Sequence, residues 1–307
     1  MSNYGGGGLM KSYSTDDDYE RQRKKRKRKR KIIIASTVSG GSIAAIVLAI
    51  VLLTSTVAFG AMGLRETDPI IISNSLRLIQ PISDEPYDYY DNSPLYPTPG
   101  DQGQQSSCTA WATVYALKGA QEGLDHKGIN GFEPIFSPAY VYNQINGGQD
   151  GGSYIHEAME LITNEGVCLL EDMPYDDQDY LTQPNDYQKD RAYAHSAWKW
   201  FGVSGVDQIK EAIVQYQGVV MGVSVYPDFN ELNEKNPVYD VQRGQNYGGH
   251  AICLVGFDDS IGAFKFINSW SEEWGLDGYG WVSYDIVNAE SMKYGAFCME
   301  DWIENNF

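Results

Sequence analysis

The chain has 307 residues, of which 42% are hydrophobic and 13% aromatic, enough for a large domain with a packed core. Its charge is unevenly divided, because residues 1–31 hold 11 Lys/Arg against 4 Asp/Glu and the remainder holds 12 against 37. Since phosphate binding depends on Lys and Arg, the acidic remainder argues against nucleic acid or anionic lipid head groups as its partners.

The N-terminal region combines a basic run with a long apolar one. Residues 1–31 begin with a glycine run, include RQRKKRKRKRK (21–31), and are predicted to be a disordered cytoplasmic tail. A basic run can also be a nuclear localisation signal or a segment that binds nucleic acid. Here, however, no charged residue occurs from Ile32 to Leu64, and about 20 apolar residues suffice for a helix to cross a bilayer.

We therefore predict a transmembrane signal-anchor helix over residues 32–61. Lys and Arg beside a first hydrophobic segment tend to stay on the cytoplasmic side, so the rest of the chain is predicted to lie outside the cell membrane. A cleaved signal peptide is the alternative, with small residues at 56–58 as the cleavage site and a secreted product. A buried soluble helix is a third possibility.

The segments after the anchor predict an α+β protein. Residues 62–100, rich in Asp, Pro and Tyr, are predicted to be a linker leading into a domain at 101–307. Capping serines and Pro at a first helical position predict helices that begin near residues 108 and 138. Apolar residues at helical spacing predict two more, one marked by residues 155–162 and ending at Gly166, the other marked by residues 209–216 and ending at Gly218. Alternating apolar runs then predict strands at 219–225, 250–257, 263–270 and 279–285. This order favours a helical lobe at about 101–200 and a sheet or barrel lobe at about 201–307.

The four cysteines do not have the spacing of a metal site or of a disulfide framework. CxxC and HxxxH patterns are absent, so no metal or organic cofactor is predicted. Cys253 alternates with apolar residues and is predicted to be a core residue, whereas Cys168 and Cys298 could pair or stay free.

Cys108 follows two serines in DQGQQSSCTAWAT (101–113), at the predicted start of a helix. A thiol there faces unpaired N–H groups, which favour the thiolate, the species that attacks carbonyl carbons. A buried core cysteine is the alternative. His250 begins an apolar strand, and Asn268 in NSWSEEWG (268–275) could hold one imidazole nitrogen while the other faces the thiol.

These motifs together resemble those of the papain-like cysteine peptidases. QGQQSSCTAW (102–111) is similar to the family's nucleophile motif, HAICLVGFDD (250–259) to its histidine strand, and FINSWSEEWGLDGYGWV (266–282) to its asparagine stretch. The segment GGSYIHEAMELITNEGVCLLEDMPY (151–175) resembles the family's Gly-Gly to Pro-Tyr region. From Cys108 to His250 there are 142 residues, within the roughly 130–150 expected.

The resemblance implies a two-lobe fold, with a helical lobe and an antiparallel β-barrel lobe, and a catalytic set. Cys108 would be the nucleophile, His250 its acid–base partner and Asn268 the residue that orients the imidazole. The Gln102 side chain and the Cys108 backbone N–H would form the oxyanion hole.

A second group of residues is placed in the substrate-binding region on the same resemblance: Gly151, Gly152, Gly249 and Trp270. The Gly-Gly pair resembles the strand that pairs with the substrate backbone, with a simple turn before the next helix as the alternative. Trp270 resembles the tryptophan that shields the His–Asn hydrogen bond from water, with a plain core aromatic as the alternative.

Departures from the family pattern bear on substrate preference and control. Thr109 stands at the family's usual Trp, Ser271 replaces a Gly, and Gly249 stands where Asp is common. Gln105 replaces a family cysteine, and its usual disulfide partner is also missing. The long helical prosegment is missing as well, so control by such an inhibitory prodomain is not expected. A short prosegment and a missing bridge favour a prokaryotic-type surface enzyme.

The sequence thus predicts a membrane-anchored, extracytoplasmic cysteine endopeptidase that acts on a peptide or protein substrate and needs no cofactor. Two alternatives remain. One is a papain-fold binding or adhesion module without turnover, and the other is a transpeptidase with the same thioester chemistry. The oligomeric state is not predicted.

Overall fold

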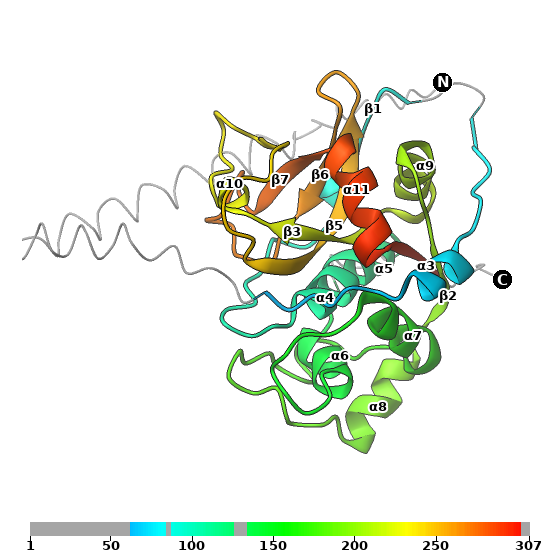
Figure 1. Ribbon diagram of the computed structural model, residues 1–307. Helices are drawn as coiled ribbons and strands as arrows, with labels where there is room; N and C mark the ends of the chain where they lie inside the picture. Colours follow the sequence, from blue (N-terminus) through cyan, green and yellow to red (C-terminus); the bar gives the residue numbers. More distant parts are fainter. Residues whose placement is uncertain (1–61, 84–86, 126–133, 302–307) are drawn as a thin grey trace, which may run out of the picture. The chain divides into compact units, whose positions relative to one another are not determined.

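The computed structural model describes residues 62–83, 87–125 and 134–301 (Figure 1). These residues belong to one of two compact units into which the chain divides. The predicted tail (1–31) and the predicted anchor (32–61) lie outside the described residues. In the part of the chain that is described, none of the helices has the length and apolarity needed to span a bilayer.

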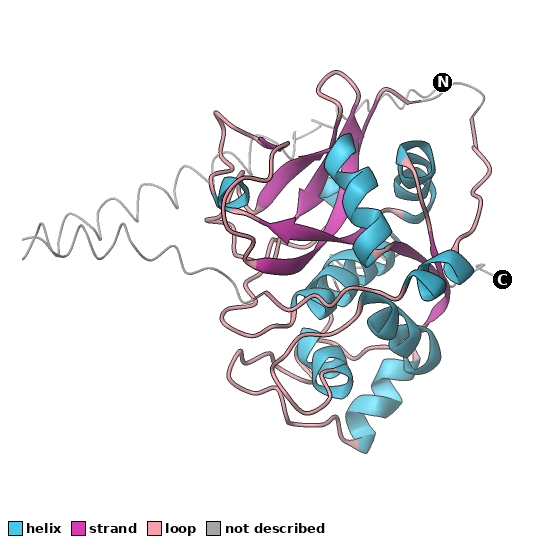
Figure 2. Ribbon diagram, in the orientation of Figure 1, coloured by secondary structure: helices cyan, strands magenta, loops and turns pink. Residues whose placement is uncertain are grey.

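Helices form one side of the described unit, and a sheet with two flanking helices forms the other (Figure 2). The helical lobe is built from α4 (Cys108–Ala110), the π-helix η2 (Trp111–Lys118), α5 (Gly119–Asp125), α6 (Pro138–Ile145), α7 (Ile155–Glu165) and α8 (Asp186–Tyr193). The first three follow one another without a break, so Cys108 opens a long helical run that is buried along almost its whole length.

Eight strands form a single sheet in the order β2-β8-β3-β5-β6-β7-β4, with β1 paired to β5. The strands are β1 (Tyr89–Asp91), β2 (Ala197–Gly202), β3 (Val219–Val225), β4 (Val238–Tyr239), β5 (Gly248–Asp258), β6 (Ala263–Ile267), β7 (Tyr279–Ser283) and β8 (Ala296–Asp301). Every pair is antiparallel except β4 with β7, which is parallel. Among the described residues the strands pair as one open sheet, whereas the resemblance implied an antiparallel β-barrel lobe.

Further short elements flank the sheet and precede the helical lobe. They are α3 (Pro69–Ser75), η1 (Ser93–Leu95), α9 (Val206–Tyr216), α10 (Pro227–Asn230) and α11 (Tyr284–Tyr294). Helices α9 and α11 lie beside the strands in Figure 1, away from the helical lobe. The fold is therefore α+β with two lobes, as predicted.

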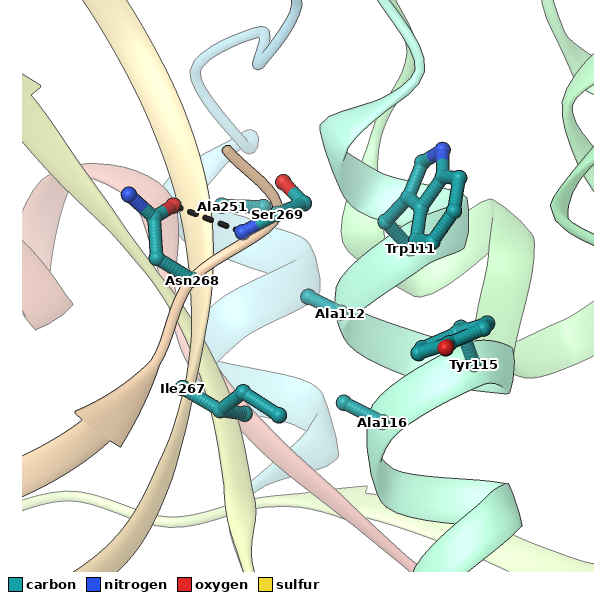
Figure 3. A pocket seen from close by; sticks show the side chains of 8 residues that line it. All are labelled: Trp111, Ala112, Tyr115, Ala116, Ala251, Ile267, Asn268 and Ser269. Carbon is teal, nitrogen blue, oxygen red and sulfur yellow. Dashed lines mark hydrogen bonds between the residues drawn. The ribbon is translucent and has the colours of Figure 1, made fainter. Parts of the chain in front are cut away.

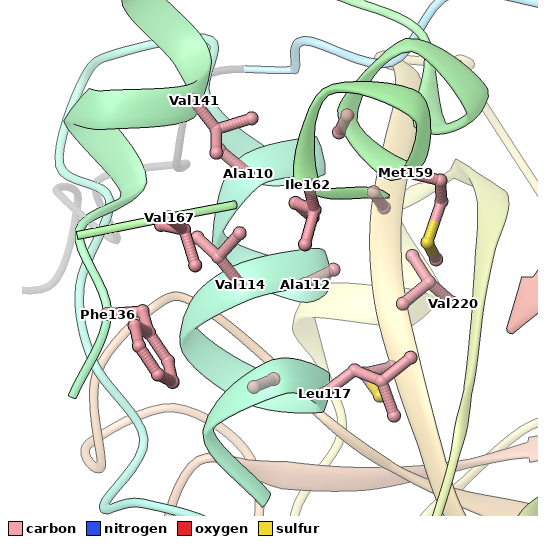
Figure 4. Close-up of a cluster of buried hydrophobic side chains, with 14 of the residues drawn as sticks. Ala110, Ala112, Val114, Leu117, Phe136, Val141, Met159, Ile162, Val167 and Val220 are labelled. Atoms are coloured by element: carbon pink, nitrogen blue, oxygen red, sulfur yellow. The ribbon is translucent and has the colours of Figure 1, made fainter. Parts of the chain in front are cut away.

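Strand β5 joins two hydrophobic cores because its side chains alternate between the faces of the sheet. Ala251, Cys253 and Val255 pack into the core of the helical lobe, where Figure 4 shows Ala110, Ala112, Val114 and Leu117 of the Cys108 run. Ile252 and Leu254 face the second core, formed by the sheet with α9 and α11. The functional segments at the start of β5 thus lie where the two cores meet.

Most of the predicted helices and strands are present. The Ser137 hydroxyl accepts a hydrogen bond from the Tyr140 N–H and caps α6, and α7 ends at Gly166, whose φ is +79°. Elements that were not predicted include α8, α11, β2 and β8. The cap predicted at the start of α4 is absent, because the Ser107 hydroxyl bonds to the Tyr175 hydroxyl at 2.7 Å instead.

Residues 62–100, expected to be a linker leading into the domain, contribute to the folded unit. Strand β1 pairs with β5, and α3 packs near β2. Leu64, Ile79 and Tyr96 are buried. The chain is extended at residues 62–65, and in Figure 1 this blue segment runs between the helical lobe and the sheet.

All four cysteines are buried and free. Cys253 lies in the core of the helical lobe, as predicted from its place in an apolar strand. Of the two outcomes left open for Cys168 and Cys298, the free thiol is the one observed.

Candidate active site

The loop before Cys108 is held against the sheet lobe at residues 269–271. The Gln102 N–H donates to the Ser269 carbonyl at 2.8 Å, and the Ser271 N–H donates to the Gly100 carbonyl at 2.8 Å. The Ser269 hydroxyl also donates to the Gln102 side-chain oxygen at 2.6 Å. These bonds join the Gln102 loop of one lobe to the Asn268 segment of the other.

Gln102 and the following residues are also fixed from the helical lobe. The Gln102 side-chain nitrogen donates to the Gln105 carbonyl at 2.9 Å, and the Tyr175 hydroxyl donates to the Gln102 carbonyl at 2.8 Å. The Asp150 carboxylate accepts a hydrogen bond from the Ser106 N–H at 2.8 Å. The backbone that leads into Cys108 is therefore rigidly placed before the helix begins.

Cys108 is the first residue of α4 and has no solvent exposure. Burial raises the pKa of its thiol to about 11, although the backbone N–H groups of Ala251 and Gly63 face the sulfur and oppose the shift. The sequence suggested that the helix start would favour the thiolate. In the structure, desolvation outweighs the N–H groups and disfavours the thiolate.

The imidazole of His250 is held by Asn268, as the sequence predicted. Nε2 of His250 lies 2.7 Å from Oδ1 of Asn268, and that oxygen also accepts the N–H of Ser269 at 2.8 Å. Figure 3 shows this second bond next to Ala251 and the Trp111 helix. Because Oδ1 can only accept, the proton of the neutral ring is on Nε2, and Nδ1 is left as the basic nitrogen.

Aromatic rings enclose His250. The Trp270 ring centroid lies 4.6 Å from that of the imidazole, and Phe229 meets the imidazole edge to face at 6.0 Å. Burial lowers the pKa of His250 to about 4, although the hydrogen bond to Asn268 opposes the shift. Burial therefore disfavours the charged form of both the thiol and the imidazole.

Cys108 and Ala251, the residue that follows His250, lie in the same buried core, where α4 packs against β5. Nδ1 of His250 is buried and has no hydrogen-bond partner among the described residues. The structure thus brings Cys108, His250, Asn268 and the Gln102 loop together at the junction of the two lobes. A small hollow lies between the Trp111 helix and the Asn268 segment (Figure 3), and its lining consists of Trp111, Ala112, Tyr115, Ala116, Ala251, Ile267, Asn268 and Ser269.

The predicted substrate-binding glycines lie around the same junction. Gly152 has a φ of +78° and approaches the Gly63 carbonyl so closely that a Cβ there would lie 2.0 Å from it. The Gly249 carbonyl accepts the Leu64 N–H at 3.0 Å, and the Gly151 carbonyl accepts from the Arg65 side chain at 3.2 Å. Trp270, placed in the same group, packs on the imidazole instead of on the segment at 62–65.

The sequence reasoning missed several residues that support the site: Asp150, Tyr175, Phe229 and Ser269. Tyr175 and Ser269 lie within the family-like motifs quoted above, but a motif does not show which atoms its side chains contact. Asp150 lies directly before the Gly-Gly pair, whereas Phe229 is in a short helix for which no pattern was visible.

Comparison with known proteins agrees with this geometry. The sequence profile described as "Papain family cysteine protease" matches residues 87–298. The chain belongs to the papain family of cysteine proteases. It is therefore a cysteine peptidase, a hydrolase.

Relatives of this papain-family peptidase include viral and protozoan proteins. It is 28% identical over 227 residues to an uncharacterized peptidase C1-like protein of Acanthamoeba polyphaga mimivirus, covering 67% of this chain and 72% of the viral protein. It is 26% identical over 209 residues to Cathepsin B-like CP2 of Giardia intestinalis, covering 64% and 67% of the two chains.

Two solved protease structures have a fold similar to that of this chain. Xylellain, a cysteine protease from Xylella fastidiosa, superposes with a TM-score of 0.66 at 22% identity, covering 80% of this chain and 96% of that one. The proCathepsin B S9 of Trypanosoma congolense superposes with a TM-score of 0.59 at 17% identity, covering 79% and 87%.

Proposed function

We propose that this peptidase is a membrane-anchored, extracytoplasmic endopeptidase that hydrolyses peptide bonds through Cys108, His250, Asn268 and Gln102. The observation that carries the proposal is the hydrogen bond from His250 Nε2 to Asn268 Oδ1, which leaves Nδ1 basic beside the Cys108 helix. An imidazole fixed in that tautomer can take the thiol proton.

In the first step, His250 Nδ1 accepts the proton from Cys108 and the thiolate attacks the carbonyl carbon of a peptide. The tetrahedral intermediate collapses when the carbon–nitrogen bond breaks and His250 returns the proton to the leaving amine. The products are a thioester on Cys108, which carries the amino-terminal part of the substrate, and the downstream peptide, which is released with a free amino terminus.

In the second step, His250 removes a proton from water, and the resulting hydroxide attacks the thioester. The carbon–sulfur bond breaks, the carboxylic acid leaves and the proton returns to Cys108. Asn268 does not exchange protons in either step. Its amide oxygen, fixed by the Ser269 N–H, keeps the ring oriented while the ring gains and loses charge.

The oxyanion would be bound by the Cys108 N–H and the Gln102 side-chain nitrogen. That nitrogen now donates to the Gln105 carbonyl, and its oxygen is fixed by Ser269, so the amide group is oriented without substrate. Loss of one such donor lowers kcat by about 10²–10³-fold in other acyl-transfer enzymes.

Gly151, Gly152 and Gly249 would pair with the backbone of the bound peptide, and Trp270 would keep water from the His250–Asn268 bond. The support for the glycines is that they already contact an extended segment of chain. The support for Trp270 is its 4.6 Å ring contact with the imidazole.

The location outside the membrane is proposed from the sequence at residues 1–61 alone. Basic residues 21–31 stand next to a charge-free apolar run. Carbonate extraction of membranes, with labelling of the full chain by a membrane-impermeant amine reagent, tests it. Release by carbonate, or protection of the lysines after residue 61 in intact cells, would contradict it.

The function is tested by incubating the full chain with a peptide library and sequencing the new amino termini. Cys108→Ala is expected to lose several orders of magnitude in rate. Cys298→Ala, which removes a buried thiol on β8, is the matched control and is expected to keep activity. Cleavage that survives in Cys108→Ala would overturn the proposal.

The alternatives give different products. A binding module would cleave nothing and would form no adduct with a thiol-directed epoxide. A transpeptidase would join an added amine to the acyl group in preference to water, so a high yield of ligated peptide would replace hydrolysis.

A further inference from the structure

One carboxylate of the helical lobe is bonded to the loop that leads into Cys108. Asp150 begins the Gly-Gly segment, here residues 150–153, and its Oδ1 accepts the Ser106 N–H at 2.8 Å. The Ser106 hydroxyl also donates to the Asp150 carbonyl at 3.4 Å. The side chain and the backbone of Asp150 therefore both hold the residue that stands two positions before the nucleophile.

The same carboxylate oxygen is fixed from a second direction by Tyr142 of α6. The Tyr142 hydroxyl donates to Oδ1 of Asp150 at 2.6 Å and accepts the Gly152 N–H at 3.3 Å. Burial and the neighbouring Asp150 carboxylate raise the pKa of Tyr142, so its hydroxyl keeps the proton that it donates. One carboxylate thus links the Cys108 loop, α6 and the Gly-Gly segment.

A second contact joins the Gly-Gly segment to the residue after the nucleophile. The buried hydroxyls of Thr109 and Ser153 are hydrogen-bonded to each other. The segment is therefore bonded to the chain on both sides of Cys108, at Ser106 and at Thr109. The contact at Ser106 has an ionised acceptor, and hydrogen bonds to ionised acceptors are stronger than those between neutral groups.

No disulfide joins the Cys108 loop to the Gly-Gly segment. Gln105 stands where related peptidases usually have a cysteine, and residues 146–152 contain no cysteine. All four cysteines of the chain are free. The relative position of the two segments therefore depends on non-covalent contacts, and the Asp150 carboxylate makes two of them.

We propose that Asp150 is a positioning residue, whose carboxylate holds the Gln102–Cys108 loop in the geometry that peptide cleavage requires. This inference rests on the proposed function, because it concerns the same reaction. The two proposed oxyanion donors, the Gln102 side chain and the Cys108 N–H, stand on either side of Ser106 in the chain. A shift of the backbone at Ser106 would move them relative to the developing oxyanion, and such misplacement lowers the rate of the chemical step.

The test compares peptide cleavage by full-length Asp150→Ala and Asp150→Asn with that of the wild type. Asn keeps an oxygen that can accept the Ser106 N–H and the Tyr142 hydroxyl, whereas Ala has none. We expect Asp150→Ala to lower kcat about 10²-fold with KM within about threefold, and Asp150→Asn to keep kcat within about threefold.

Asp179→Ala is the matched control and should match the wild type. Asp179 also belongs to the helical lobe, but its carboxylate accepts the N–H groups of Leu181 and Thr182 in its own turn. An unchanged kcat in Asp150→Ala would overturn the proposal. A loss in Asp150→Asn as large as that in Asp150→Ala would also overturn it, because the acceptor oxygen would then not matter.

Alkylation of Cys108 separates positioning from general damage to the fold. Iodoacetamide is attacked by the thiolate in a displacement that forms no oxyanion, so it does not use the donors at Gln102. The labelling rate of Cys108, measured by mass spectrometry, should fall by no more than about twofold in Asp150→Ala. Equal falls in kcat and in labelling would overturn the proposal.

Hydrogen exchange tests the same contact without turnover. The Ser106 amide should be protected in the wild type and in Asp150→Asn, and should exchange at least about tenfold faster in Asp150→Ala. Equal exchange in the three proteins would overturn the proposal. A wild type that cleaves no peptide would overturn the proposed function instead, and the exchange of Ser106 would then decide whether Asp150 holds the loop.

Discussion

Two histidines of this peptidase each pack against an aromatic ring but have different partners. His250 packs on Trp270 and its Nε2 bonds to the amide oxygen of Asn268. His195 packs edge to face on Phe136, at 5.1 Å between ring centroids, and its Nδ1 lies 3.0 Å from the Glu122 carboxylate.

The difference in partner explains the difference in role. An amide oxygen orients a ring without adding a charge, so the imidazole of His250 can gain and lose a proton. A carboxylate adds a fixed charge. Glu122 also pairs with the buried Lys118 at 2.9 Å, and Lys118 pairs with Asp301 at 2.5 Å, so this cluster connects η2 and α5 to β8. We therefore assign catalysis to the first histidine and stability to the second.

The largest effect that would separate the two histidines is on turnover. His250→Ala should lower kcat/KM by about 10⁴-fold or more, because it removes the base proposed to take the Cys108 proton. His195→Ala should leave kcat/KM within about threefold while lowering the unfolding temperature. Equal losses of kcat/KM in the two variants would remove the distinction.

The next effect is on stability and belongs to the His195 cluster. Lys118→Met should lower the free energy of unfolding by about 3 kcal/mol, because it leaves the carboxylates of Glu122 and Asp301 without their shared cation. The exposed Lys235 is the control, and Lys235→Met should change stability by less than about 0.5 kcal/mol. Urea unfolding followed by circular dichroism measures both, and a loss below 1 kcal/mol for Lys118→Met would count against the assignment.

Acid should destabilise the two regions in separate pH ranges. The folded pKa of His250 is about 4, below its ordinary 6.5, so its contribution is complete above pH 6.5 and is lost as the pH falls to about 4. Burial alone would raise the pKa of Glu122, but His195 and Lys118 outweigh it and lower the value from 4.5 to about 2. Its contribution is therefore complete above pH 4.5 and is lost as the pH falls to about 2.

Each shift corresponds to about 3 kcal/mol at most. The free energy of unfolding should be measured between pH 7 and pH 2.5. Its decrease with falling pH should be smaller above pH 4 in His250→Gln, and smaller below pH 4.5 in Glu122→Gln. If both substitutions reduce the pH dependence of the unfolding free energy over the same pH range, the two histidine regions are not independent.

The smallest effect concerns orientation. Asn268→Ala should lower kcat/KM by about 10²-fold, the size of effect that a misplaced catalytic group produces. The pH–rate profile should lose height, and its acid limb should move to lower pH, because the hydrogen bond to Asn268 raises the pKa of His250. A variant as active as its parent would show that Trp270 and Phe229 orient the ring by themselves.

The sequence predicted the parts of the site that depend on local motifs. Cys108, His250 and Asn268 each stand in a motif whose neighbours set the local backbone, and the structure brings their segments together as expected. The strands around residues 219–225 and 250–257 could be predicted because their apolar runs are long and uninterrupted.

What could not be predicted depends on contacts between distant residues. Leu64 has no periodicity around it, and its backbone partners Ser153 and Gly249 lie far along the chain. Ser107 looked like a helix cap, but the Tyr175 hydroxyl competes for its side chain. Helix α8 did carry a local signal, the capping box of Asn185 and Gln188, which was overlooked.

The covalent intermediate tests the central assignment most directly. Acid-quenched turnover of an ester substrate by the full chain, followed by digestion and mass spectrometry, should place one acyl group on the peptide that contains Cys108. The acyl group should be absent from the Cys108→Ala chain. Turnover with the acyl group on another residue, or with none on Cys108 at any quench time, would contradict the account.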